Sequence, residues 1–416
     1  MHKTRGLSAL AVVATAAMTL AACSGSGATT STSGASTVTY GVLSCFTGRL
    51  ASLGQAMLQG TQAAEKAINS AGGVLGKRTD MAQGDTSCDL ADAVPATKQL
   101  LSHNVAGVIG PTTQEIAAVE PILRGNKIVD EFQGGDPSFD HHTDPFLFRD
   151  SPSDSQLGVA MALYAHQKGY TRAALLFYTD AAAQTLLAPI RKTFTKLGGT
   201  IVKTISVAPG QTSYLPQVQE IIHSHPQVIF TQTDAPTAAV LFRDFQQSNN
   251  LAIPFIGTDI TAGSDYLKAI TYPVAKAHLV SVYGTSVSGP ANSEFLKLFN
   301  EIHPGQQPLA NANYAYDSAI TLAIAQDYAK TTDGPIVAKD MKKVTNPPGT
   351  ACSTYPKCLK LLKAGKKINY EGASGSIDYN KFNNVFGPYG SFVVDSHGNE
   401  HRTSLLSATA LAAATP

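Results

Sequence analysis

Hydroxyl, glycine and carboxylate residues gather in short polar segments that follow the apolar runs of this sequence. These segments are residues 44–53, 110–114, 133–136, 179–183, 232–234 and 258–261. Hydroxyl and backbone N–H groups can bind anions, and carboxylates accept hydrogen bonds from ammonium groups. The sequence has no G-x-S-x-G elbow, no H-E-x-x-H pair, no phosphate-binding loop and no dinucleotide-binding G-x-G-x-x-G after an expected strand. The pattern therefore favours capture of a small polar molecule over its chemical conversion.

An exported hydrolase is the competing class of protein. Gly372-Ala-Ser-Gly375 lacks the spacing of a nucleophile elbow, and His223 and His225 flank the end of an expected helix, as capping residues do. Asp140-His-His142 and Asp144 have the composition of a metal site, but no spacing among them fixes a coordination geometry. We expect a solvated loop there, and we expect no metal, no cofactor and no enzymatic activity.

Four cysteines follow the N-terminal region: Cys45, Cys88, Cys352 and Cys358. An even number is typical of disulfide-bonded exported proteins, and four cysteines allow three pairings. We predict Cys45–Cys88, at the ends of two neighbouring strands, and Cys352–Cys358, which closes a short loop. A zinc site is the alternative, and the lack of paired C-x-x-C units and of nearby histidines argues against it.

Residues 1–22 are typical of a bacterial lipoprotein signal peptide. The apolar run Leu7–Leu20 is too short for a membrane span, and Leu20-Ala-Ala-Cys23 resembles the box at which such signals are cleaved and the cysteine lipidated. A secretory signal with a chance cysteine is the alternative. Residues 23–37 are mostly Ser, Gly, Thr and Ala, which predicts a flexible tether. We expect an exported protein, anchored to the outer face of the cell membrane through lipidated Cys23.

The composition indicates the kinds of partner. About 390 residues follow the signal, which suggests two domains. The formal net charge is +1, and removal of Lys3 and Arg5 with the signal makes it −1. No basic patch indicates a nucleic acid partner, and no second long apolar stretch indicates a membrane span. A small-molecule ligand and a lipid-mediated contact with the membrane are the partners that we expect.

Short apolar runs alternate with amphipathic ones along most of the chain. Predicted strands are 38–44, 105–109, 127–132, 173–178, 200–207, 227–231 and 254–257. Predicted helices are 55–70, 113–123, 181–197, 214–224 and 235–249. Strand–helix alternation of this kind makes parallel, doubly wound sheets, and two successive sets predict two α/β lobes. Ligands bind beyond the carboxyl ends of such strands, so the polar segments should face a cleft between the lobes.

Six segments resemble motifs of one known family, the branched-chain amino-acid (leucine/isoleucine/valine) type of class I periplasmic solute-binding proteins. In chain order they are Phe46–Gly54, Ile68–Gly76, Val108–Pro111, Phe148–Asp154, Phe255–Asp259 and Tyr314–Asp317. The resemblance covers nearly the whole mature chain. It implies an amino acid or a related polar solute as ligand, lobes that close on it, and the permease subunits of an ABC importer as partners. A sensory module of the same fold is an alternative that the sequence leaves open.

The resemblance also implies where the chain crosses between lobes. The boundaries that it implies are 38–150 with 283–388 for lobe one, and 151–282 with 389–416 for lobe two. The crossings would lie near residues 149–152, 282–284 and 388–391, as a three-segment hinge.

In family members that bind amino acids, lobe one holds the ligand carboxylate. The resemblance carries this role to Thr112, Thr113 and Gln114, and independently the N-terminus of a helix favours an anion. Thr112 as a helix N-cap is the alternative. A second set of donors maps to Gln133, Gly134 and Gly135, where the family has small hydroxyl residues. Gly135 lacks that hydroxyl, which is a departure from the family's pattern for carboxylate binding.

In lobe two, the resemblance assigns the ligand ammonium to Asp259. Family members carry aromatic rings at two further positions, which map to Ala182, after Asp180, and near Asp234; Leu53 also takes a position often held by a ring. Acidic residues without aromatic partners predict a ligand that is more cationic or more polar than leucine. Asp234 as the cap of the following helix is the equal alternative.

Overall fold

The computed structural model describes residues 37–284 and 289–415. The expected signal peptide, lipidated Cys23 and all of the expected tether except its last residue lie outside these residues. Within the described ranges, no helix is both long enough and apolar enough to span a bilayer. Two large sheets organise the chain, and we call the elements packed around them lobe one and lobe two.

The sheet of lobe one has five parallel strands in the order β2-β1-β3-β4-β5. They are β1 (Val38–Ser44), β2 (Thr79–Asp85), β3 (Val108–Ile109), β4 (Asp130–Glu131) and β5 (Leu147–Phe148). Successive side chains of a strand point to opposite faces. Val42 of β1 accordingly packs with α1 and α12, whereas Leu43 packs with α2 and α3. The sheet is therefore buried on both faces, as parallel sheets are.

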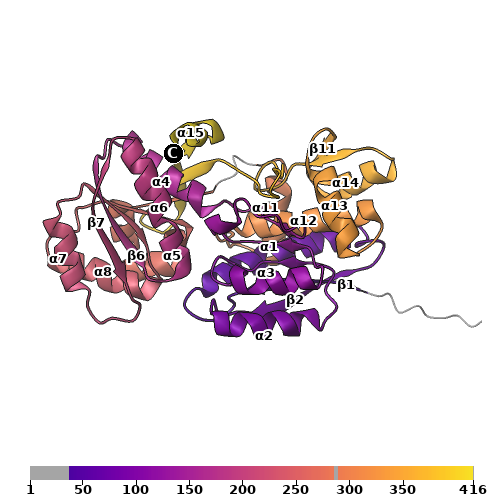
Figure 1. Ribbon diagram of the computed structural model, residues 1–416, viewed down its shortest axis with the longest axis horizontal. Coiled ribbons are helices and arrows are strands. Elements are labelled where there is room, and N and C mark those ends of the chain that lie inside the picture. Colours follow the sequence, from indigo (N-terminus) through magenta and orange to yellow (C-terminus); the bar gives the residue numbers. More distant parts are fainter. Residues whose placement is uncertain (1–36, 285–288, 416) are drawn as a thin grey trace, which may run out of the picture. The chain divides into compact units, whose positions relative to one another are not determined.

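The helices of lobe one come from two distant stretches of the chain. The first stretch forms α1 (Ala51–Ser70), α2 (Leu90–Leu101), α3 (Ile116–Gly125) and the short turn η1 (Pro137–Phe139). The second forms α11 (Asn292–Ile302), α12 (Ala312–Ala329), α13 (Gly334–Thr345), α14 (Tyr355–Lys363) and the small pair β11 (Thr350–Cys352) and β12 (Ile368–Tyr370). Figure 1 shows α12, in orange, beside α1, in indigo, and the two helices are in contact.

The sheet of lobe two has seven strands in the order β14-β13-β10-β9-β8-β6-β7. They are β6 (Arg172–Tyr178), β7 (Thr200–Val207), β8 (Val228–Gln232), β9 (Phe255–Gly257), β10 (Leu279–Gly284), β13 (Tyr389–Val394) and β14 (Glu400–Leu406). Strands β6, β7, β8, β9 and β10 run parallel to one another. Strand β13 runs antiparallel to both of its neighbours, so the C-terminal hairpin departs from the wholly parallel sheet that we predicted.

The helices of lobe two cover this sheet and complete one continuous core. They are α4 (Asp154–Gln167), α5 (Ala181–Thr185), α6 (Leu187–Lys196), α7 (Leu215–His223), α8 (Ala235–Gln247), η2 (Asp259–Ala262), α9 (Ser264–Ile270), α10 (Tyr272–His278) and α15 (Ala408–Ala414). The C-terminal helix α15 packs against α4, so the end of the chain returns to the lobe that its middle forms (Figure 1).

Both predicted disulfides are confirmed. Cys45–Cys88 joins the segments that follow β1 and β2, with 4.9 Å between the Cα atoms, and Cys352–Cys358 closes the loop between β11 and α14, with 5.3 Å between them. In the described part of the chain, one group places three potential metal-ligand atoms within 4.8 Å of one another, and it consists of the first disulfide and Glu115. Its two sulfurs are already bonded to each other.

The expectation of a solvated loop at residues 140–144 is confirmed only in part: His141 and Thr143 are exposed, whereas Asp140 and His142 are half-buried and Asp144 is buried. The Asp140 carboxylate accepts hydrogen bonds from the buried Arg149 guanidinium and, at 2.6 Å, from Ser153. Asp144 is 9% exposed and accepts from the Phe146 N–H, and both ring nitrogens of His142 are shielded from solvent. Part of the loop is packed because the buried Arg149 guanidinium needs an anionic partner.

Candidate functional site

A cavity of about 120 Å³ lies between the two lobes. It is close in size to the engineered cavity of about 150 Å³ that holds benzene in another protein, so a small organic solute matches it. Nine of the eleven residues predicted to bind ligand line it: Leu53, Thr112, Thr113, Gln114, Gln133, Gly134, Gly135, Ala182 and Asp259. Their contact with a ligand stays a prediction.

One end of the cavity offers hydrogen-bond donors from lobe one. Helix α3 begins at Ile116, three residues later than predicted, so Thr113 and Gln114 form the turn that leads into it. Within the described residues, the backbone N–H groups of Thr113, Gln114 and Gly134 have no protein acceptor. The Thr113 hydroxyl accepts from the Gly135 N–H at 2.7 Å, which leaves its own proton available. This end can therefore bind an anionic group.

Thr112 lines the cavity but is not the N-cap of α3, so the capping alternative is wrong and its contact with a ligand stays a prediction. Its hydroxyl donates to the Glu115 carboxylate at 2.7 Å, and Glu115, not Thr112, occupies the position before α3. Thr86 donates to the same carboxylate, which is wholly buried, and burial raises the pKa of Glu115. The Thr112 oxygen can thus accept a hydrogen bond in the cavity, but its proton is already used.

The two glycines of the 133–135 segment are required by close packing. A Cβ atom at Gly134 would stand 2.4 Å from the Thr113 nitrogen, and one at Gly135 would stand 2.0 Å from the Asp154 carboxylate. The Gln133 amide donates to Asp150 at 2.9 Å and to Ser318 at 2.6 Å, which leaves its carbonyl oxygen as an acceptor. The hydroxyl that Gly135 lacks is therefore replaced by space for a carboxylate.

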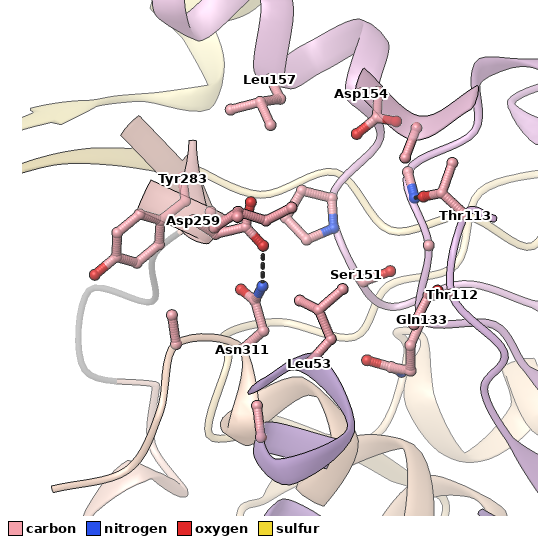
Figure 2. Close-up of a pocket in the computed structure, with 18 of the residues that line it drawn as sticks. Leu53, Thr112, Thr113, Gln133, Ser151, Asp154, Leu157, Asp259, Tyr283 and Asn311 are labelled. Atoms are coloured by element: carbon pink, nitrogen blue, oxygen red, sulfur yellow. Dashed lines mark hydrogen bonds between the residues drawn. The ribbon is translucent and has the colours of Figure 1, made fainter. Parts of the chain in front are cut away.

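That carboxylate, Asp154, is a cavity residue to which the sequence interpretation assigned no ligand role. It belongs to the first turn of α4, accepts from Thr185 at 2.7 Å, and points into the cavity beside Leu157 (Figure 2). Burial raises the pKa of Asp154 to about 7, and the nearby Asp259 acts in the same direction. The sequence signal was the Asp of Phe148–Asp154, which was used only to recognise the family.

Asp259 lies at the opposite end of the cavity from Thr112, Thr113 and Gln133 (Figure 2). It begins the 3₁₀ turn η2, and its Oδ2 accepts from the Asn311 side-chain amide at 2.6 Å, across the two lobes. Burial raises the pKa of Asp259, although the Asn311 donor opposes the shift. Asn311 precedes α12, where sequence reasoning alone would assign it to helix capping, but its side chain caps nothing.

Two predicted ligand-binding residues lie outside the cavity lining, Asp180 and Asp234. Each caps a helix instead: Asp180 accepts from the Ala183 N–H at 2.8 Å, and Asp234 from the Thr237 N–H at 2.9 Å. The capping alternative for Asp234 is thereby confirmed. Asp234 is 2% exposed and also receives the Arg49 guanidinium of lobe one at 3.2 Å, so its charge is already paired.

The charged side chains in the described lining of the cavity are all acidic. Asp154 and Asp259 line it, and no Lys, Arg or His occurs among its described lining residues. Arg49 points to Asp234 and to the Tyr178 hydroxyl, at 3.2 Å each, outside the lining. An ammonium group at Asp259 would offset that carboxylate, whereas a purely anionic ligand would bring no positive charge to either one.

Comparison with known proteins places the chain in a family. The sequence profile described as periplasmic binding protein matches residues 37–353. This chain belongs to the periplasmic binding protein family. Leu/Ile/Val-binding protein homolog 1 of Brucella suis biovar 1 (strain 1330) is 24% identical over 301 residues, which are 71% of this chain and 80% of that protein. The resemblance recognised from the six motifs is confirmed.

Solved structures of periplasmic binding proteins share the fold. The leucine binding protein LivK of Thermotoga maritima superposes with a TM-score of 0.75 at 19% identity, over 89% of this chain and 99% of that one. An ABC transporter solute-binding protein of R. palustris, in complex with benzoate, gives a TM-score of 0.73 at 18% identity, over 89% and 97%. The class I fold with two doubly wound lobes is therefore shown for this periplasmic binding protein.

Proposed function

We propose that this protein is the extracytoplasmic substrate-binding component of an ABC importer and captures an amino acid or an amino-acid-like solute between its lobes. The arrangement of the cavity carries the proposal. N–H donors of Thr113, Gln114 and Gly134 stand at one end, and the Asp259 carboxylate stands at the other. A zwitterion matches both ends, because its carboxylate accepts and its ammonium donates.

Contacts between the crossing segments support closure by a hinge. The Arg149 backbone exchanges hydrogen bonds with Asn383 and Val385, at 2.9 and 2.8 Å, and its side chain bonds Asn384 at 3.0 Å. The first crossing and the segment before the third are thus held side by side. We propose the hinge and the lobe boundaries given above on this basis, because hinges rotate about a few residues at the ends of elements.

The ligand class follows from the charges. The leucine-binding and benzoate-bound relatives named above share the fold, but this cavity has two carboxylates and no described basic lining residue. Benzoate would bring no positive charge to either carboxylate and would add a negative charge between them. We infer a solute with an ammonium group and a polar or further cationic part, rather than leucine or an aromatic acid.

Mass spectrometry of the purified protein under native conditions, followed by a thermal-shift screen, tests the proposal. The screen pairs each amino acid with its deaminated carboxylic acid and includes benzoate. We expect a retained or added amino acid to raise Tm by about 5 °C at hundredfold excess over Kd, and the deaminated partner to have little effect. Stabilisation by benzoate or by the deaminated acids would reject the ammonium at Asp259. Selective stabilisation by leucine or valine would reject the more polar ligand.

Export and anchoring are proposed from the N-terminal motif alone. Substitution Cys23→Ser removes the only thiol that the motif offers for acylation. The variant should appear in the soluble extracytoplasmic fraction, whereas the unaltered protein should sediment with membranes and incorporate a labelled fatty acid. Equal labelling of both proteins would contradict lipidation at Cys23.

A further inference from the structure

A second cavity, of about 520 Å³, adjoins the first one. The residues that line both are Leu53, Asp259, Ile260, Ala310 and Asn311. We call the first the inner chamber and the second the outer chamber. The outer chamber is bounded by the 307–311 segment of lobe one, and by the start of α9 and residues 398–400 of lobe two. A ligand held at Asp259 therefore has open space on two sides.

The hydrogen bond between Asp259 and Asn311 stands where the two chambers meet (Figure 2). Asn311 has a left-handed backbone, with φ 72° and ψ −2°, a conformation that asparagine tolerates better than most residues. The segment before it is anchored by the Leu309 N–H, which donates to Gln59 at 2.8 Å. The backbone is thus held, whereas the half-buried side chain has one hydrogen-bond partner among the described residues, the Asp259 carboxylate that an ammonium would also bind.

As in the inner chamber, the charged side chains in the described lining of the outer chamber are all acidic. Its described lining contains the carboxylates of Asp259 and Glu400 and no Lys, Arg or His. Glu400 begins β14 and is exposed at the rim of the chamber; partial desolvation raises its pKa, and the Tyr283 hydroxyl and the neighbouring His401 oppose the shift. Tyr283, whose ring is stacked on Phe392 with centroids 4.1 Å apart, stands close enough to Glu400 for each to influence the pKa of the other. A carboxylate in such surroundings favours a cation over a neutral group.

We propose that the outer chamber is a second ligand subsite, in which Glu400 pairs with the far, positively charged end of an elongated solute held at Asp259. The ligand class is a linear molecule with two amino groups, such as a diamino acid. Its first ammonium displaces the Asn311 amide from Asp259, and its chain passes Leu53 and Ile260 into the outer chamber. This inference rests on the proposed function and deepens it.

A matched pair of ligands and a matched pair of variants test the subsite. Lysine and norleucine have the same chain length and differ in the terminal amine. Glu400→Gln removes the proposed partner of that amine. Glu220→Gln is the control, because Glu220 is exposed on α7, forms its ion pair within the described residues with Lys203, and lines neither chamber. Isothermal titration of both ligands into the whole chain and both variants gives six affinities.

We expect the unaltered protein to bind lysine about tenfold more tightly than norleucine. Glu400→Gln should weaken lysine binding by about fivefold or more and leave norleucine within twofold, and Glu220→Gln should change neither. Equal affinity for the two ligands, or an equal loss for both in Glu400→Gln, would reject the subsite while leaving the proposed function standing. A protein that binds neither ligand, nor any amine in the thermal-shift screen, would reject the proposed function and the subsite together.

Discussion

Asp234 and Asp259 make an instructive pair, because both follow strands of lobe two and both receive a side chain from lobe one. Asp234 caps α8 and holds the Arg49 guanidinium at 3.2 Å, so its charge is balanced within the protein. Asp259 receives only the neutral Asn311 amide from lobe one and lines the cavity. The difference teaches that an acidic residue at a strand end is available to a ligand only when the fold has not already given it a cation.

The largest difference is expected when each carboxylate is changed to its amide. Asp259→Asn should lower the affinity for an amino-acid ligand by about a hundredfold, because a buried charged partner of the ammonium is lost. Asp234→Asn should change it only several-fold, since Asn also caps helices and the residue lies outside the cavity. Isothermal titration of both variants measures this contrast. Similar losses of ligand affinity in the two variants would contradict the assignment of the ligand ammonium to Asp259 rather than to Asp234.

The next effect concerns pH, through the second cavity carboxylate. Burial raises the pKa of Asp154 to about 7, well above the unfolded value, so the folded protein favours the protonated form. Its contribution to stability is complete below pH 4 and is lost as the pH rises through 7. Asp154 stands beside Thr113, at the end proposed for the ligand carboxylate, so its ionisation opposes that carboxylate and affinity should fall by up to about tenfold between pH 6 and 8.

Titrations across that pH range, with buffers of different ionisation enthalpy, measure both the affinity and the proton taken up on binding. Asp154→Asn should flatten the profile, and Glu220→Gln, which changes the net charge equally, should preserve the slope. A profile that stays steep in Asp154→Asn would assign the proton to another group.

The smallest effect concerns the ion pair that connects the lobes outside the cavity. Arg49 is 53% exposed, so its attraction to Asp234 is screened by salt. Arg49→Gln should weaken ligand binding by about threefold, chiefly through faster dissociation, because closed lobes lose one contact. A double-mutant cycle with Asp234→Asn should give a coupling of about 0.5 kcal/mol that shrinks at high salt. Zero coupling would show that the pair does not favour closure.

The elements that sequence patterns predicted well are those with a clear period. Strands β1 and β7 have the predicted bounds, Val38–Ser44 and Thr200–Val207. Helix α12 received no prediction, because it is buried at nearly every position from Ala312 to Gln326 and has no polar face to reveal a helical period. Strand β2, Thr79–Asp85, is polar and lies at the edge of its sheet, so no apolar run marks it.

The residues of the candidate site also differ in whether the sequence could place them. Residues that follow strands, such as Thr113 and Asp259, could be placed at the cavity from the rule for parallel sheets. Asp154 and Asn311 could not, because each begins or precedes a helix and resembles an ordinary first-turn or capping residue. The partner of Arg49 depends on which loops of the two lobes meet, and no local pattern in the sequence records that.

The interleaving of the two lobes along the chain has a consequence for synthesis. Lobe one needs α11 to α14 from the later part of the chain, and the sheet of lobe two is finished only by β13 and β14. Neither lobe can be completed while the last quarter of the protein is still on the ribosome. Such delayed completion would suit the export proposed from the N-terminal motif, because neither lobe is finished until synthesis is nearly complete. The same order means that cutting the gene in half would yield two fragments with incomplete cores, rather than two separate lobes.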